Sequence, residues 1–216
     1  MGYKSTQNLR IMSRPLKLNI LLLGSSGVGK STILSRYANR NHLPGKTIGI
    51  EVCSSAITDR TRDYAPPTFL KTYDMGGSRY YWQWITDYTK NANIVFLFYD
   101  VTNTKTLEEA AEILEIIKKD RNKFRTIIVG NKTDLESKRE VKIFDVNKWI
   151  GKRRQEGWQL RHIECSRDNI ISIKTILDRA VNGMKKIEIP LEFRKTDFNL
   201  NKPEREKSWS NYLVPW

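Results

Sequence analysis

LLLGSSGVGKST, residues 21–32, is the stretch of sequence that decides the fold. Residues 21–23 predict a buried strand, residues 24–29 a tight loop, and residues 30–32 the first turn of a helix. The stretch matches the pattern G-x-x-x-x-G-K-[ST] at every fixed position. Glycines allow successive backbone N–H groups to point inward, and the start of the helix and Lys30 add positive charge. The sequence therefore predicts a loop that wraps around a polyphosphate. The alternative is a glycine-rich turn between a strand and a helix that carries a surface lysine.

The composition limits the class of protein. A chain of 216 residues is long enough for one domain with extensions. It has no run of about 18 apolar residues, and its first residues lack the apolar core of a secretory signal, so we expect a cytoplasmic protein. Cys53 and Cys165 lie far apart, and His42 and His162 form no motif, which argues against disulfides or a zinc site. We expect both cysteines to be buried.

The chain is strongly basic, with a formal net charge of +14. Such a charge would attract nucleic acid, anionic lipid or an acidic protein surface. Lys and Arg are spread along the chain in short clusters, and no familiar aromatic and basic nucleic-acid module is present. We therefore expect a solvated basic surface, no specific nucleic acid, and at most peripheral contact with an anionic membrane.

Strands and helices alternate regularly beyond the loop. This alternation is typical of an α/β fold with a mostly parallel, doubly wound six-stranded sheet, which binds ligands at the carboxyl ends of its strands. Residues 59–67 suit the tip of a hairpin, which would add one antiparallel edge strand. We expect strands at 51–57, 69–73, 94–100, 126–132 and 162–165, and helices at 32–40, 106–121, 145–156 and 171–186.

The two ends of the chain differ in composition from its middle. Residues 1–15 are polar and basic, which predicts a flexible N-terminal arm, and residues 188–216 are polar and contain prolines, which predicts an extended C-terminal tail. We expect a single domain over residues 16–187. Apolar side chains of the tail could fold back on this domain or bind a partner.

An acidic motif follows the strand at 69–73. In YDMGG, residues 73–77, Asp74 can hold Mg²⁺ through water while Ser31 binds the ion directly. The Gly77 amide can then approach a γ-phosphate. This motif adds a metal and a third phosphate to the predicted polyphosphate site.

Another motif specifies the base. NKTD, residues 131–134, follows the strand at 126–132, and the Asp134 carboxylate can accept both the N1–H and the exocyclic amino group of guanine. Adenine does not offer this pair of donors, so the motif selects GTP over ATP. Cys165 and Ser166 follow the last expected strand, where their backbone amides could reach the guanine carbonyl.

Taken together, these motifs resemble those of the Ras superfamily of small GTPases, and most of all its Rab branch. The resemblance covers about residues 16–187 and implies a P-loop G domain. It implies that Thr47 is the switch I threonine, which binds Mg²⁺ through its hydroxyl and senses the γ-phosphate through its N–H, so that GTP orders the loop and hydrolysis releases it. The segments that carry it are GSSGVGKST (24–32), TIGIE (47–51), YDMGG (73–77), FYDVTN (98–103), GNKTDL (130–135) and ECS (164–166).

The motifs and the resemblance give three sets of site residues. We expect catalytic roles for Lys30, Thr47 and Gly77. We expect Mg²⁺ to be held by Ser31, Thr47 and Asp74. The nucleotide, GTP or GDP, is expected to contact Ser26, Gly27, Val28, Gly29, Lys30, Ser31, Thr32, Asn131, Lys132, Asp134, Cys165 and Ser166.

The sequence departs from the family at several positions. Ser78 stands where a glutamine normally orients the attacking water, and serine is too short for that role, so we expect slow hydrolysis unless a partner supplies the missing group. Leu43 stands roughly where an aromatic ring normally covers the guanine, which predicts fast nucleotide exchange unless a nearby side chain replaces it. Arg167 and Asp168 follow Ser166 in place of the usual Ala-Lys.

The segment after Ser78, RYYWQWITDY, is rich in aromatic side chains. Some of them are expected to pack the following helix on the sheet, and at least two to be exposed in the GTP state. Exposed aromatic residues beside a nucleotide-controlled loop are strong anchors for an effector, a regulatory protein or a second subunit, so a homodimer is possible. The candidate contact residues, together with switch I, are Tyr80, Tyr81, Trp82 and Trp84.

No cysteine follows Cys165, whereas most Rab proteins end in prenylated cysteines, so we expect no prenyl anchor. Together with the Asp-x-Gly-Gly-Ser sequence, this resembles the atypical, non-prenylated Rab-like proteins. The first functional hypothesis is a slow, partner-dependent GTP switch in trafficking or signalling. The second is a nucleotide-bound pseudo-GTPase scaffold with little or no hydrolysis. A basic nucleic-acid-binding module that happens to hold a nucleotide is a third hypothesis.

Overall fold

A six-stranded sheet with the order β2-β3-β1-β4-β5-β6 forms the centre of the computed structural model, which describes residues 15–37, 45–57 and 68–167. β2 (Ile50–Ile57) is antiparallel to β3 and lies at one edge of the sheet. All the other neighbouring strands are parallel, so the predicted sheet is confirmed. They are β1 (Leu16–Gly24), β3 (Thr68–Met75), β4 (Ile94–Asp100), β5 (Arg125–Asn131) and β6 (Leu160–Glu164).

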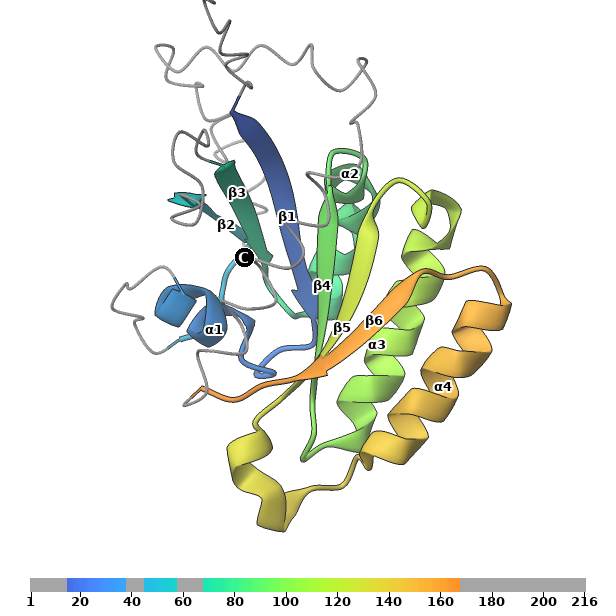
Figure 1. Ribbon diagram of the computed structural model, residues 1–216. Coiled ribbons are helices and arrows are strands. Elements are labelled where there is room, and N and C mark those ends of the chain that lie inside the picture. The colour runs from blue at the N-terminus through green and yellow to red at the C-terminus, as the bar shows by residue number, and fades with distance from the viewer. Residues whose placement is uncertain (1–14, 38–44, 58–67, 168–216) are drawn as a thin grey trace, which may run out of the picture.

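Helices cover both faces of the sheet (Figure 1). α1 (Lys30–Tyr37) lies on one face, whereas α3 (Thr104–Ile117) and α4 (Ile143–Gln155) lie on the other. The short helix α2 (Ile85–Thr89) packs on the same face as α3. Short 3-10 turns span Arg79–Trp84, Lys118–Asp120 and Thr133–Lys138. No helix among the described residues is both long and apolar enough to cross a bilayer.

The sheet separates two apolar clusters, because neighbouring residues of a strand face opposite sides. In β1, Leu21 and Leu23 pack on the side of α3 and α4, whereas Ile20 and Leu22 pack on the side of α1. All seven residues of β4 are buried, as expected for a parallel strand covered on both faces. The fold therefore buries its core on both sides of β1 and β4.

Most predicted elements are present, with shifted ends. The predicted strand at 94–100 has the bounds of β4. α3 begins at Thr104, two residues before the predicted start at 106, because the Asn103 side chain accepts a hydrogen bond from the Lys105 N–H at 3.1 Å and caps the helix. The predicted hairpin tip at 59–67 and the predicted helix at 171–186 lie outside the described residues.

The double-sided core predicts a stability test. Replacing Leu97, which is completely buried in β4, by alanine should lower the free energy of unfolding by about 2–5 kcal/mol, because it removes buried methyl groups and leaves a cavity. Urea unfolding under identical conditions measures this. Leu135→Ala is the matched control, since that side chain is 37% exposed, and it should cost much less. Equal losses in the two variants would contradict the assignment of the core.

Candidate nucleotide-binding site

The loop between β1 and α1, residues 24–29, is called the phosphate loop below. It packs directly against the end of β5. The Asn131 side-chain amide donates a hydrogen bond of 2.8 Å to the Val28 carbonyl. Gly29 has a φ of 92°, and a Cβ at this position would overlap the Asn131 amide nitrogen. Glycine is therefore needed here both for the backbone conformation and for the close approach of β5. The Val28 side chain is buried in the core, whereas Ser26 and Gly27 are exposed at the tip of the loop.

Lys30, the first residue of α1, is buried beneath the loop. Its ammonium donates hydrogen bonds to the carbonyls of Gly24 at 2.7 Å and Ser25 at 2.9 Å. Burial lowers the pKa of Lys30 to about 8, although the nearby Asp74 carboxylate favours the charged form. An anion bound in the loop would favour the charged form further, as expected for a lysine that contacts phosphate.

Ser31, in the first turn of α1, lies next to Thr47. Their hydroxyl oxygens are 2.8 Å apart. Adjacent ligands of an octahedral Mg²⁺, each about 2.1 Å from the ion, lie about 3 Å apart, so the pair has a spacing that fits this ion. Asp74 at the end of β3 is completely buried and close enough to Lys30 to act on its pKa.

These three residues could hold Mg²⁺ only together with other oxygen donors. In the described parts of the chain, no group of three His, Cys, Asp or Glu side chains could form a metal cage. One carboxylate, two hydroxyls and phosphate oxygens form the kind of donor set on which Mg²⁺ relies in phosphate-transfer sites. The residues present therefore fit this ion as part of a nucleotide complex.

The YDMGG segment lies against both the phosphate loop and the Thr47 region. A Cβ at Gly77 would overlap the backbone of Ser25 and Ser26. The Gly76 N–H donates a hydrogen bond of 2.8 Å to the Gly49 carbonyl. Glycine at 77 thus allows this segment to approach the loop closely, which is what a γ-phosphate contact through the Gly77 amide requires.

The NKTD motif and Cys165 meet at the ends of the neighbouring strands β5 and β6. Both the N–H and the hydroxyl of Thr133 donate to the Cys165 carbonyl, at 3.3 and 3.2 Å. Asp134 is exposed at the start of its 3-10 turn, so its carboxylate is accessible to a base. Cys165 and Ser166 are buried, and burial raises the pKa of the Cys165 thiol to about 12, which makes it a poor nucleophile.

Lys132 has a partner that the sequence did not reveal. Its ammonium lies 2.5 Å from the Asp100 carboxylate at the end of β4, and Asp100 accepts two further hydrogen bonds from the N–H and hydroxyl of Thr102. These charged and polar donors help to hold the pKa of Asp100 below its ordinary value, against the opposing effect of burial. Asp100 lies within the quoted segment FYDVTN, but only the fold brings it to Lys132.

The structure thus brings the predicted residues together at the carboxyl ends of the strands. These ends are surrounded by the phosphate loop, Thr47, Gly77 and the NKTD motif. Thr32 lies in the first turn of α1 and is half-buried. Leu43 and Asp168 lie outside the described residues, so the expected loss of the guanine cover is still a prediction.

The comparisons with known proteins agree with this architecture. The sequence matches the Ras family over residues 19–186. It is also similar to Ras-related protein Rab-28 of Caenorhabditis elegans, with 33% identity over 132 residues. The matched region is 58% of this chain and 52% of that protein, so the chain matches about half the length of this relative.

Replacing Lys30 by alanine should weaken GDP binding by about a hundredfold, because it removes a charge-assisted hydrogen bond between a buried side chain and a phosphate. Equilibrium titration with a fluorescent GDP analogue measures the change. Lys148→Ala, at an exposed position of α4, is the matched control and should bind as the unmodified protein does. A similar affinity for GDP in the two variants would show that Lys30 does not bind the nucleotide.

Replacing Asp134 by asparagine should weaken GTP binding by about ten- to hundredfold and favour xanthosine nucleotides, because one hydrogen-bond polarity is reversed. Competition between the two nucleotides for the same fluorescent analogue measures this preference. Asp145→Asn, at an exposed position in the first turn of α4, is the control. Unchanged GTP affinity in D134N would show that the base lies elsewhere.

Proposed function

Because the chain belongs to the Ras family, we propose that it binds GTP and GDP with Mg²⁺ and acts as a slow, partner-dependent molecular switch in intracellular trafficking or signalling. The observation that carries this proposal is the 2.8 Å contact between the Ser31 and Thr47 hydroxyls, in line with their expected roles as Mg²⁺ ligands. The similarity to Rab-28 supports placing the function within the Rab branch.

Each part of the site has a role in this proposal. The phosphate loop and Lys30 bind the phosphates, and Ser31, Thr47 and Asp74 hold the ion, which when bound would offset the negative charge of the phosphates. Asn131, Lys132 and Asp134 orient and select the guanine, with Cys165 and Ser166 beside it. Gly77 and Thr47 distinguish GTP from GDP, because only GTP presents a γ-phosphate to their amides.

The position of Ser78 supports slow hydrolysis. Its hydroxyl accepts a hydrogen bond from the Tyr80 N–H at 3.4 Å and so caps the turn at Arg79–Trp84. A side chain engaged in this local bond, and shorter than glutamine, is poorly suited to orient a water molecule. Hydrolysis would then depend on a group supplied by a partner.

Exposed side chains beside Thr47 and in the segment after Ser78, which together are called the switch segments below, support a protein partner. Ile48, next to Thr47, is 87% exposed, and Tyr80 is 65% exposed. Tyr81, Trp82 and Trp84 are half-buried and pack against the core, which supports a packing role for most of their surface. We propose that Ile48 and Tyr80 contribute most to an effector interface, and a second copy of the chain is an alternative occupant. The exposure of at least two aromatic residues in the GTP state stays a prediction.

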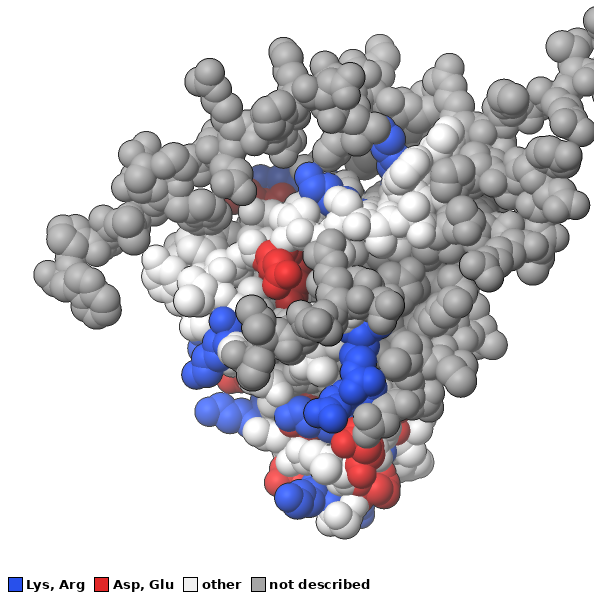
Figure 2. Space-filling view, turned by 90° about the vertical axis from the view of Figure 1, so that its left-hand side faces the viewer, with Lys and Arg blue, Asp and Glu red and all other residues white. Residues whose placement is uncertain are grey.

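The domain boundaries, the location and the character of the surface belong to the same proposal. The Ras family match over residues 19–186 supports a G domain at 16–187, flanked by an arm at 1–15 and a tail at 188–216. We propose a cytoplasmic location. On the face in Figure 2, basic side chains lie in several separate groups, some of them beside acidic ones, which supports a solvated surface over a specific nucleic-acid site.

Ser78 also supports a second candidate function. A pseudo-GTPase scaffold would retain GTP as a structural ligand and present the same surface at all times. The two candidates differ in the rate of hydrolysis, because only a switch must return to the GDP form.

Single-turnover hydrolysis with Mg²⁺ should be slow in the unmodified protein and at least about tenfold faster in Ser78→Gln, because glutamine restores a group that can orient water. The same substitution at the exposed Ser54 of β2 is the matched control and should leave the rate unchanged. Retained GTP with no hydrolysis in either the unmodified protein or S78Q would instead favour the scaffold.

A further inference from the structure

Arg79, which follows Ser78, ties this segment to α3. Its guanidinium donates two hydrogen bonds to the Glu112 carboxylate, at 2.7 and 2.8 Å. It also lies 3.7 Å from a Glu109 oxygen and 4.6 Å from the centre of the Trp82 ring. The hydrogen bond from Arg79 holds the pKa of Glu112 below its ordinary value. A paired, stacked arginine of this kind has a more defined position than an ordinary surface side chain.

Glu109 also contacts the phosphate loop. Its carboxylate accepts a hydrogen bond from the Ser25 hydroxyl. Ser25 is only 4% exposed, and its carbonyl accepts one of the hydrogen bonds of Lys30. A single carboxylate of α3 therefore contacts the phosphate loop on one side and lies beside Arg79 on the other.

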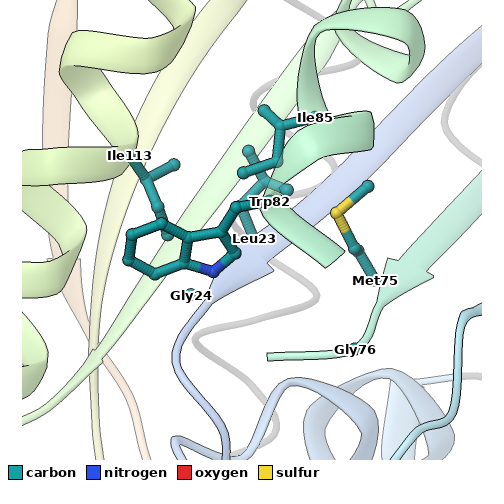
Figure 3. A pocket seen from close by; sticks show the side chains of 7 residues that line it. All are labelled: Leu23, Gly24, Met75, Gly76, Trp82, Ile85 and Ile113. Carbon is teal, nitrogen blue, oxygen red and sulfur yellow. The ribbon is translucent and has the colours of Figure 1, made fainter. Parts of the chain in front are cut away.

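Trp82 packs beneath this connection, against the core. Figure 3 shows its indole ring between Ile113 of α3 and the end of β1 at Gly24. Trp82, Met75 and Gly76 line the same small apolar hollow. Because Arg79 stacks on this ring, moving Arg79 away from α3 would disturb the packing next to the YDMGG segment.

We propose that Glu109 and Glu112 are positioning residues that hold Arg79 on α3 and thereby keep the segment 74–78 closed on the phosphate loop, which favours GTP over GDP. This inference rests on the proposed function. Only the γ-phosphate uses the backbone amides of Gly77 and Thr47, so loss of the closed position weakens GTP retention while the contacts to GDP remain. Because the Arg79 side chain is 57% exposed, its ion pairs alone contribute modestly, and the more shielded bond from Ser25 to Glu109 adds to them.

The test compares dissociation of a fluorescent, non-hydrolysable GTP analogue with that of the matching GDP analogue. In Glu109→Gln, Glu112→Gln and Arg79→Ala, the GTP analogue should dissociate about three- to tenfold faster, while GDP dissociation changes less than about twofold. Glu108→Gln is the matched control, because Glu108 is an exposed neighbour on the same helix. The control should release both nucleotides as the unmodified protein does.

The outcomes separate this inference from the proposed function. If the unmodified protein binds neither analogue, the proposed function fails and this inference fails with it. If it binds both, and the variants release them at unchanged rates or accelerate both equally, only this inference is overturned. Equal acceleration would show that the ion pairs merely support the fold.

A coupling experiment tests the role of Glu109 separately. Ser25→Ala should accelerate release of the GTP analogue in the unmodified background but have little further effect once Glu109→Ala is present, because each of these changes removes the same hydrogen bond from the Ser25 hydroxyl to Glu109. Additive effects of the two changes would show that Ser25 acts on the nucleotide without Glu109, and would overturn the proposed connection.

Discussion

The hydrogen bond from the Asn131 amide to the Val28 carbonyl joins the two halves of the candidate site. One half, at the end of β1, suits phosphates, and the other, at the ends of β5 and β6, suits a base. Parallel pairing of β1 with β4 and of β4 with β5 brings these ends to the same edge, and the bond then fixes the loop against β5. Gly29 allows the contact, because any side chain would push Asn131 away. The distance between phosphate and base subsites is thus set by the sheet.

Contacts of α3 extend this arrangement toward the switch segments. Glu109 and Glu112 lie on a helix that also contributes Ile113 to the core, so their charges are attached to a rigid element. Arg79 and Trp82, in contrast, lie in a short 3-10 turn with no buried residue of its own. A rigid helix beside a short turn whose aromatic side chains are at most half-buried is a physical arrangement in which a few polar contacts can decide the position of a segment.

Much of the fold could be predicted because its signals are local. The largely apolar segment IVFLFYD predicted β4 with its correct bounds, and the glycine pattern predicted the turn into α1. The 3-10 turn at Arg79–Trp84 was not predicted, because RYYWQW has neither helical nor strand periodicity. For the site, contiguous motifs identified residues that the sheet brings together. The bond between Ser25 and Glu109 joins residues 84 positions apart, and the pairing of Lys132 with Asp100 also depends on the tertiary fold, so no local pattern signalled either contact.

The burial of both cysteines has a practical consequence. Cys53 and Cys165 are each no more than 3% exposed, and the raised pKa of Cys165 leaves little thiolate at neutral pH. Thiol-reactive dyes should therefore label the native protein poorly. A cysteine introduced at an exposed site would become a nearly selective attachment point for a spectroscopic label, without prior removal of the native thiols. The closed core thus makes the domain well suited to distance measurements in solution, for example between labels placed next to Thr47 and on α3.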